Sequence, residues 1–249
     1  MSTHGTGTAA QKVVLVTGAG SGIGEAVARR LAAQGHTVVL TGRRAERLRA
    51  VADDLTAAGH TARAHPLDVT DRAAFAALAA QAAAEHGRLD VLVANAGVML
   101  LSRLESLLVD EWDRMFDVNV KGLYNGVAAV LPHFRAQGSG HVVTVASVGA
   151  YEVPPTSAVY SATKFAARAL TEGLRVESDP SVRVTTVSPG VTESELAEHI
   201  TDPYAADFMV EYRRRSIPAD AVARAVAFAL DQPADVDVNE IIVRPAAQR

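Results

Sequence analysis

Short apolar runs alternate along the chain with longer alanine-rich segments whose apolar residues recur at helical spacing. The apolar runs predict β-strands and the periodic segments predict helices. We expect strands at residues 13–17, 37–41, 61–66, 89–94, 141–146, 182–187 and 240–243. We expect helices at residues 22–34, 45–58, 71–86, 111–137, 158–177 and 219–231.

This order predicts the fold class. Strands that are almost wholly apolar and separated by helices form a parallel sheet that is covered on both faces. We therefore expect an α/β protein with a doubly wound, Rossmann-type sheet of about seven strands. One catalytic domain would span residues 12–249, after a flexible N-terminal segment over residues 1–11.

Residues 193–218 break the pattern between a strand end and the next helix. Such a segment is either a substrate lid over the carboxyl end of the sheet or a peripheral helical insertion whose aromatic side chains pack down. Its notable residues are His199, Pro203, Tyr204, Phe208, Met209, Tyr212 and the run Arg213 to Arg215.

Composition excludes several classes of function. The 249 residues include no cysteine, and the net charge is −4. Disulfides and thiolate chemistry are therefore excluded, and nothing favours nucleic acid or anionic lipid as a partner. No apolar run approaches the ~18 residues of a membrane span. The N-terminus does not resemble a signal peptide, so we expect a cytoplasmic protein. The eight histidines lack the spacing of metal ligands, and no metal is expected.

A glycine-rich turn follows the first predicted strand and opens the first helix. Its letters fit GxxxGxG, with glycine at the three defining positions. Glycine lets backbone amides approach a phosphate, and the helix N-terminus favours its negative charge. The turn predicts a dinucleotide site, the alternative being a turn needed only for packing. Its residues are Gly18, Gly20, Ser21, Gly22, Ile23 and Gly24.

The end of the second strand bears on the choice of cofactor. A fold that prefers NAD usually has an acidic residue there for the ribose 2′-hydroxyl. Here Gly42 is followed by Arg43 and Arg44. Because guanidinium groups bind phosphate, we expect NADP(H) in preference to NAD(H). The alternative is that the arginines only begin a solvated helix, which suits Arg44 better than Arg43.

Tyr160 and Lys164 are four residues apart in a predicted helix, which places them on one face. A neighbouring ammonium favours the phenolate, so Tyr160 is a candidate acid/base. Ser147 follows a predicted strand at the end where doubly wound folds bind ligands. The pair alone is weak evidence, and its weight comes from the glycine turn.

Together these features resemble the short-chain dehydrogenase/reductase family in its compact single-domain branch, over nearly the whole chain. Within it, residues 97–101 and 238–245 look like the clavulanate dehydrogenase group and the NADP-dependent 3-hydroxy acid and serine dehydrogenases. One departure is Ala94, where the family commonly has asparagine. The marks of the family are residues 17–24, Leu67-Asp68-Val69, Asn95-Ala96-Gly97, Asn119, Ser147, Tyr160 with Lys164, and Pro189-Gly190.

The resemblance implies a catalytic set of Asn119, Ser147, Tyr160 and Lys164. Tyr160 would exchange a proton with the carbonyl or alcohol oxygen, which Ser147 would polarise. Lys164 would hold the nicotinamide ribose and, with the positive nicotinamide, bring the Tyr160 pKa toward neutrality. Asn119 would kink its helix and hold a water that links Lys164 to solvent, the alternative being an incidental polar core residue.

The resemblance also implies cofactor and substrate contacts. Asp68 would accept from the adenine amino group, or else cap the following helix. Asn95 would meet the adenosine, while Thr192 and Ser194 would bind the carboxamide. The remaining cofactor contacts implied are Val69, Ala96, Gly97, Pro189, Gly190 and Val191. The substrate would be bounded by Val98, Met99, Ser147, Tyr151, Val153, Tyr160, Val191 and the 193–218 segment.

These inferences predict an NADP(H)-dependent carbonyl reductase or alcohol dehydrogenase for a small to medium ketone, aldehyde or secondary alcohol. The alternative is a regulator on the same fold that binds NADPH without turnover. The family resemblance further implies a homo-oligomer, a tetramer or dimer, that pairs through the helices at 111–137 and 158–177.

Overall fold

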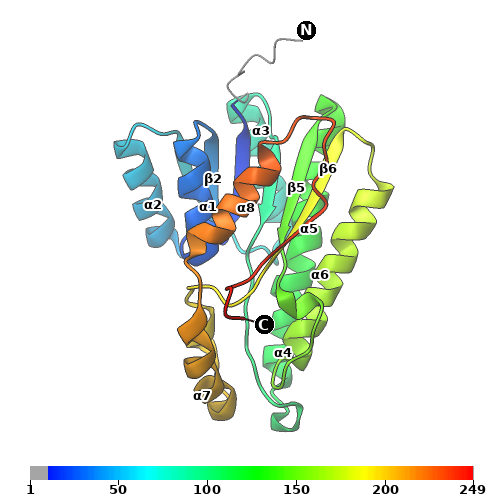
Figure 1. Cartoon of the computed structure of the whole chain (residues 1–249). Helices are drawn as coiled ribbons and strands as arrows, with labels where there is room; N and C mark the ends of the chain where they lie inside the picture. Colours follow the sequence, from blue (N-terminus) through cyan, green and yellow to red (C-terminus); the bar gives the residue numbers. More distant parts are fainter. Residues whose placement is uncertain (1–10, 249) are drawn as a thin grey trace.

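In the computed structural model, which describes residues 11–248, seven parallel strands form one sheet (Figure 1). Their order is β3-β2-β1-β4-β5-β6-β7, which confirms the doubly wound α/β prediction. We expected residues 1–11 to be flexible, and of these residues 1–10 lie outside the described part of the chain. The strands are β1 Val13–Thr17, β2 Thr37–Gly42, β3 Ala62–Pro66, β4 Val91–Ala94, β5 Gly140–Val145, β6 Val182–Pro189 and β7 Glu240–Val243.

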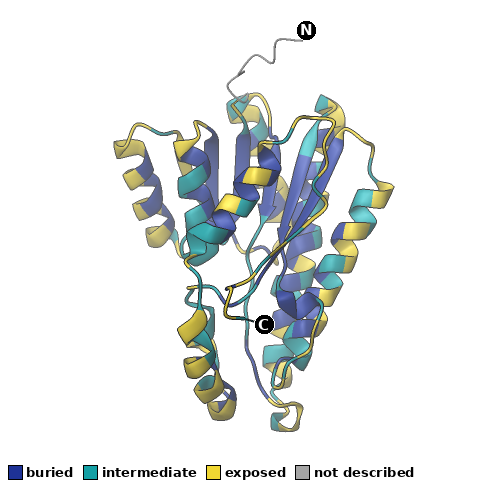
Figure 2. Ribbon diagram, in the orientation of Figure 1, coloured by how far each residue is buried: buried dark blue, intermediate teal, exposed yellow. Residues whose placement is uncertain are grey.

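Helices cover both faces of the sheet because successive strand side chains point to opposite faces. In β1, Val14 and Val16 pack with α1, α2 and α8, while Val13 and Leu15 pack with α3 and α5. Figure 2 shows the buried strands between helices whose outer faces are exposed. These helices are α1 Gly22–Ala33, α2 Ala45–Ala57, α3 Arg72–His86, α5 Gly122–Gln137 and α8 Ala219–Leu230, and α6 Ala158–Glu177 lies beside α5. No described helix is long and apolar enough to cross a membrane.

The helix expected over residues 111–137 contains an irregular turn. Helix α4, Val109–Phe116, continues through a π-helical turn, Asp117–Lys121, into α5. Apolar periodicity does not reveal such a turn, because a π-bulge inserts a residue without ending the helix. The turn carries Asn119, whose side chain bonds both backbone groups of Val98.

The 193–218 segment lies beyond the carboxyl ends of the strands (Figure 1). It forms the short 3₁₀ turns η4, Leu196–His199, and η5, Arg213–Arg215, on either side of α7, Pro203–Tyr212. Ala205 and Met209 of α7 pack against Leu101, which follows β4. The segment is therefore a packed part of the domain.

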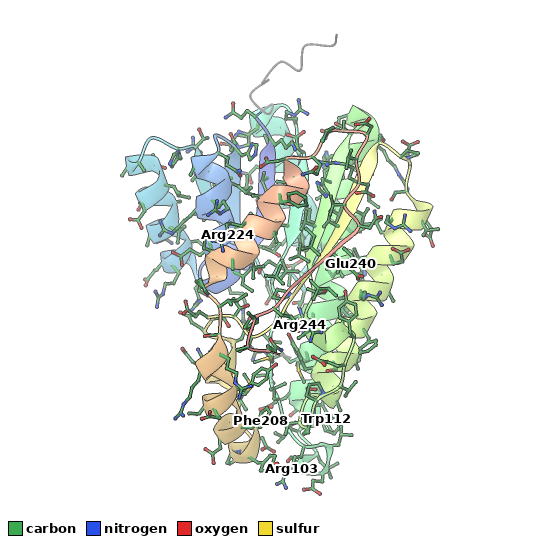
Figure 3. The ribbon with its side chains drawn as sticks, in the orientation of Figure 1. Arg103, Trp112, Phe208, Arg224, Glu240 and Arg244 are labelled. Carbon is green, nitrogen blue, oxygen red and sulfur yellow. The ribbon has the colours of Figure 1, made fainter. Side chains whose placement is uncertain are left out.

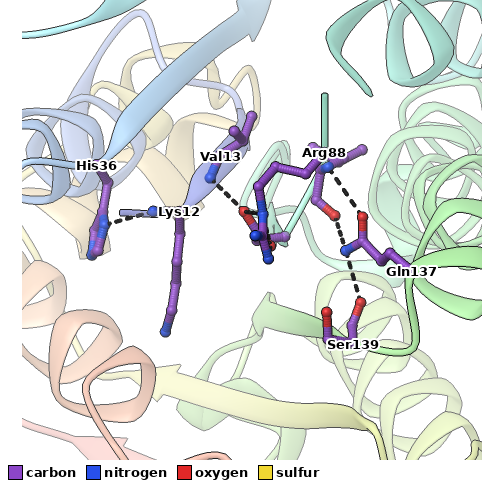
Figure 4. Close-up of polar contacts among 8 residues, drawn as sticks. Lys12, Val13, His36, Arg88, Gln137 and Ser139 are labelled. Carbon is purple, nitrogen blue, oxygen red and sulfur yellow. Dashed lines mark hydrogen bonds and ion pairs between the residues drawn. The ribbon is translucent and has the colours of Figure 1, made fainter. Parts of the chain in front are cut away.

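Polar contacts join the strands at the opposite, amino end of the sheet (Figure 4). Buried Asp90 accepts from the Val13 amide at 2.8 Å and from the Arg88 guanidinium. The Gln137 side chain donates to the Leu89 carbonyl, and His36 Nδ1 accepts from the Lys12 amide. Because these contacts join β1 to the start of β4, they hold the central strands in place relative to each other.

Two cations cap α8 at the same end. Lys12 Nζ donates to the Leu230 carbonyl at 2.6 Å, and the Arg183 guanidinium donates to the Ala229 carbonyl at 3.3 Å. Positive charge there complements the helix dipole. It also acts on buried His141, whose Nε2 lies 2.8 Å from Thr185 Oγ1. Burial, helped by Arg183 and Lys12, holds the pKa of His141 well below its usual value.

We predict that acid destabilises this protein partly through His141. It stays neutral when folded, whereas the unfolded chain takes up a proton as the pH falls below 6.5. The contribution of neutral His141 to the free energy of unfolding is thus fully present above that pH. Below it, this contribution is lost by up to about 1.4 kcal/mol per pH unit. Urea unfolding between pH 7.5 and about 5.5 should show a shallower pH slope in His141→Gln than in the parent. Exposed His199, changed to Gln, is the control, and an unchanged slope in His141→Gln would refute the assignment.

Candidate active site

The glycine turn is shaped by close backbone packing. Gly18 and Gly22 have φ of 67° and 54°, values that L side chains rarely adopt. A Cβ on Gly24 would lie 2.3 Å from the Gly18 carbonyl oxygen, so the helix packs directly on the turn. Ser21, the N-cap of α1, makes no side-chain cap hydrogen bond. The geometry fits a pyrophosphate, because the first amides of α1 are not capped by that side chain.

Thr17 and Asn95 join this turn to the end of β4. Asn95 Nδ2 donates to the Thr17 carbonyl at 2.8 Å, and Thr17 Oγ1 accepts from the amides of Asn95 and Ala96, each at 3.0 Å. Asn95 therefore positions the turn, while its contact with adenosine stays a prediction. The motif includes Thr17, but its role as a hydrogen-bonding hub was not predicted.

A cavity, here called the cofactor cavity, lies over the turn. Asp68 lines it, and its Oδ1 accepts from the amide and hydroxyl of Thr70 at 2.9 and 2.8 Å. The alternative that Asp68 caps the following helix is wrong, because Asp71 caps α3 through the Ala74 amide. The expected residues that line the cavity are Gly18, Gly20, Ser21, Gly22, Ile23, Gly42, Arg43, Arg44, Asp68, Val69, Asn95, Ala96, Gly97 and Ser194.

The two arginines after β2 differ in their surroundings. Arg43 is exposed and makes no ion pair or side-chain hydrogen bond with residues 11–248. Arg44 Nη2 lies 2.7 Å from Glu195 Oε2 and donates to Ser21 Oγ at 2.7 Å. Arg44 therefore does not simply begin a solvated helix. Its guanidinium holds the pKa of Glu195 below the usual value, so the carboxylate is charged at neutral pH.

Ser147, Tyr160 and Lys164 line a second cavity, here called the substrate cavity. Ser147 follows β5 and begins the 3₁₀ turn Val148–Ala150, with its Oγ accepting from the Gly149 amide at 3.0 Å. Lys164 Nζ donates to the Val145 carbonyl at 3.2 Å and lies 5.8 Å from the centre of the Tyr160 ring. The β5 end and α6 thus bring a hydroxyl, a phenol and an amine together.

The pKa values differ from the simple expectation for this pair. Burial raises the pKa of Tyr160, which the Ser147 hydroxyl partly offsets, and burial lowers the pKa of Lys164 to about 8. Burial disfavours both charged forms, and Lys164 Nζ is directed to a carbonyl. The chain's own amine therefore does not acidify the phenol, in contrast to the prediction from spacing alone.

Asn119 lies beside Lys164 through the backbone at Gly97. Its Oδ1 accepts from the Val98 amide at 2.8 Å, and its Nδ2 donates to the Val98 carbonyl and to Thr163 Oγ1. A Cβ on Gly97 would lie 3.3 Å from Asn119 Oδ1 and 3.7 Å from Lys164 Nζ. The interpretation of Asn119 as an incidental core residue does not account for this placement, and the water relay stays a prediction.

The substrate cavity is largely apolar. Of the expected residues, Val98, Met99 and Val191 line it, as do Pro189, Gly190, Thr192 and Ser194. The 193–218 segment contributes Leu196, Ala197, Phe208, Met209, Tyr212 and Arg213, of which Phe208 is labelled in Figure 3. Leu101, Pro154 and Pro155 also line it and were not predicted, although a proline pair after a strand is a loop signal.

Two of the expected substrate contacts, Tyr151 and Val153, lie outside the lining of this cavity. Tyr151 does not line the substrate cavity, because its hydroxyl donates to Glu240 Oε1 at 2.5 Å and the Arg168 guanidinium lies 4.6 Å from its ring centre. Figure 3 shows Glu240 beside α6, well apart from Phe208. Val153 is 59% exposed and also lies outside the lining. Neighbouring Pro154 and Pro155 form this part of the wall.

Gln248 joins the end of β6 to the 193–218 segment. Its Oε1 accepts from the Val191 amide at 3.0 Å, and its Nε2 donates to Tyr212 Oη at 2.5 Å. The Thr192 hydroxyl donates to the Gly190 carbonyl. The backbone donor of Val191 is therefore already used, and no sequence signal had indicated Gln248.

Comparisons with known proteins agree with this geometry. A family model described as short chain dehydrogenase matches residues 12–205. An uncharacterised oxidoreductase of Staphylococcus saprophyticus is 43% identical over 241 residues, which cover 95% of this chain and 97% of that protein.

The chain is also similar in sequence and in fold to solved structures. The closed form of a serine dehydrogenase complexed with NADP⁺ is 34% identical, with a TM-score of 0.86 and coverage of 95% of this chain and 96% of that chain. A short chain dehydrogenase/reductase from Burkholderia phymatum in complex with NAD is 28% identical, with a TM-score of 0.86 and coverage of 93% and 88%. The matched model, the relatives and the site agree, and the chain belongs to the short-chain dehydrogenase family of oxidoreductases.

Proposed function

We propose that this protein is an NADP(H)-dependent carbonyl reductase or alcohol dehydrogenase. One observation carries the proposal: the cavity that contains Tyr160, Ser147 and Lys164 adjoins the cavity over the glycine turn. Both cavities share lining residues, namely Ile23, Asn95, Gly97, Val98, Ser194 and Leu196. A dinucleotide held on the turn would thus extend to the phenol.

Side chains of the protein itself would transfer the proton. The bound nicotinamide supplies the hydride. The Tyr160 hydroxyl donates its proton to the substrate oxygen during reduction, and Ser147 Oγ donates a hydrogen bond to the same oxygen. A phenol is protonated at neutral pH, and burial, which raises the pKa of Tyr160, keeps it so, as reduction requires. Lys164, whose Nζ donates to the Val145 carbonyl, would bind the ribose hydroxyls.

The wall of the substrate cavity supports the choice of substrate. Met99, Leu101, Phe208 and Met209 present apolar surface toward the side of Tyr160. An apolar pocket with a few convergent polar groups binds a hydrophobic molecule in a defined orientation. We therefore propose a small to medium ketone, aldehyde or secondary alcohol.

The preference for NADP(H) rests on the end of β2. Gly42 offers no carboxylate for a ribose 2′-hydroxyl, and Arg43 is exposed beside the cofactor cavity. A guanidinium with free donors binds a phosphate bidentately. The related structures carry either NADP⁺ or NAD, so the argument depends on these residues.

A cofactor-binding regulator without turnover is the alternative. It would use the cofactor cavity but would have no need of Ser147, Tyr160 and Lys164 in one cavity. The two functions differ in whether NADPH is consumed.

We predict that Tyr160→Phe loses activity and keeps the cofactor. Loss of the proton donor should lower kcat/KM about 10²- to 10⁴-fold for carbonyls that the parent reduces, because general acids contribute on that scale. NADPH affinity should change by less than about threefold, since the phenyl ring remains. The measurement is NADPH absorbance decay across ketones, aldehydes and keto acids, with binding titrations alongside. Tyr204→Phe, on the exposed side of α7, is the control. Tight NADPH binding by the parent without turnover would favour the regulator.

We predict that Arg43→Gln weakens NADPH selectively. Loss of charged hydrogen bonds worth about 1.5–3 kcal/mol should raise the Kd of NADPH roughly tenfold to a hundredfold. The Kd of NADH should change little, because NADH has no 2′-phosphate. Arg49→Gln, also exposed and on α2, is the matched control. Equal losses for both cofactors would contradict the assignment.

We also propose that α5 and α6 pair with a second copy of the chain. On α6, Phe165 and Val176 are 41% and 67% exposed, on the face that also carries exposed Ala162 and Ala169. Nothing lies within 4 Å of a Cβ built on Gly173. Such a face lets two helices approach closely, and a self-complementary contact suits two-fold symmetry.

We predict a dimer or tetramer by light scattering. Phe165→Asp should shift the protein toward smaller species, because it places a charge in the apolar contact. Val210→Asp, at another exposed apolar position on α7, should leave the mass unchanged. A monomeric parent at micromolar concentration would exclude the interface.

A further inference from the structure

Glu195 joins the 193–218 segment to the cofactor cavity. Its Oε2 lies 2.7 Å from Arg44 Nη2, and its Oε1 lies 3.9 Å from Arg47. The same Arg44 nitrogen donates to Ser21 Oγ in the glycine turn. The carboxylate thus lies on a cationic group at the edge of the cavity, beside the N-terminus of α1.

A phosphate could readily replace the Glu195 carboxylate at Arg44. The side chains of Glu195 and Arg44 are 32% and 50% exposed, so water reaches both partners. An ion pair this exposed contributes little to stability. A phosphate brings more negative charge and more acceptor oxygens than a carboxylate, so it competes well for a guanidinium.

The contact also connects two parts of the site. Glu195 immediately precedes η4, whose Leu196 and Ala197 line the substrate cavity. The adjacent Ser194 carbonyl accepts from Arg213 at 2.7 Å, and a Cβ on Gly22 would lie 3.3 Å from Ser194 Cβ. A shift of Glu195 would therefore move the neighbouring residues that form the wall of the substrate cavity.

We propose that Glu195 is an internal competitor for the ribose 2′-phosphate at Arg44, and that its displacement transmits recognition of that phosphate to the 193–218 segment. The inference rests on the proposed preference for NADP(H). A ligand that carries the 2′-phosphate takes the Arg44 guanidinium from Glu195. A ligand without it leaves the ion pair intact.

Adenosine fragments test this directly, because they lack the nicotinamide half that would itself touch the segment. The probes are adenosine 2′,5′-bisphosphate and adenosine 5′-monophosphate, titrated calorimetrically into the full chain. Glu195→Gln should bind the bisphosphate about two- to fivefold more tightly than the parent, the scale of an exposed ion pair. Affinity for the monophosphate should not change.

Two further variants isolate the pair. Glu198→Gln removes the same charge three residues away, where Glu198 is exposed and has no ion-pair partner among residues 11–248, and it should bind as the parent does. In an Arg44→Gln background, Glu195→Gln should give no gain. A double-mutant cycle thus separates competition at Arg44 from a general change in charge.

Amide hydrogen exchange reports the transmitted effect. In the parent, the bisphosphate should speed exchange in residues 193–218 and the monophosphate should not. In Glu195→Gln the exchange should already be fast without ligand, and the bisphosphate should add little.

The outcomes distinguish this inference from the proposed function. If the parent binds the bisphosphate no better than the monophosphate, the preference for NADP(H) is wrong and the inference fails with it. If the parent discriminates but Glu195→Gln matches it in affinity and exchange, only the competitor role is overturned. A similar gain in Glu198→Gln would also overturn it.

Discussion

The meeting of β1 and β4 at their carboxyl ends is the constraint on which the site depends. Thr17 accepts from two successive amides after β4, and the Asn95 side chain returns to the Thr17 carbonyl. Gly24 then packs on the Gly18 carbonyl with no room for a Cβ. Because these contacts are short and mutually dependent, the glycine turn has one position relative to the β4 loop. That loop in turn carries Gly97 between Asn119 and Lys164. The cofactor cavity and the proton-transfer groups are therefore parts of one rigid arrangement.

The proton chemistry follows from burial within that arrangement. Both Tyr160 and Lys164 lose solvation, so the environment favours the neutral phenol and brings the pKa of the amine to about 8. A protonated phenol suits the donation of a proton to a carbonyl oxygen. Proton removal from an alcohol needs the opposite, and the positive charge of an oxidised nicotinamide would favour it. On the proposed function, the direction of proton transfer would thus be set by the charge that the bound nicotinamide brings to the site.

The central strands were predictable because burial on both faces produces apolar runs, whereas the edge strands β3 and β7 are only partly buried. The glycine turn and the pair Tyr160 and Lys164 were predictable because their spacing is local. Contacts between distant segments were not. Tyr151 is turned away from the substrate cavity by Glu240 of β7, and Arg44 is paired with Glu195. The π-helical turn at Asn119 also escapes periodicity, since it changes the helix by one residue.

The contacts that hold the two sides of the site differ in how far they are exposed to solvent. Lys164 is buried and bonded to the main chain of the sheet at Val145, whereas Ser147 and Tyr160 are partly buried. The segment that forms the outer wall of the substrate cavity packs on Leu101 through buried Ala205 and Met209, and its more exposed polar contacts are Glu195 with Arg44 and Gln248 with Tyr212. Displacing a partly exposed pair costs little, whereas breaking a buried one leaves a charge without a partner. On the proposed function, we therefore expect a response to ligands in the exposed polar contacts of residues 193–218, and not at Lys164.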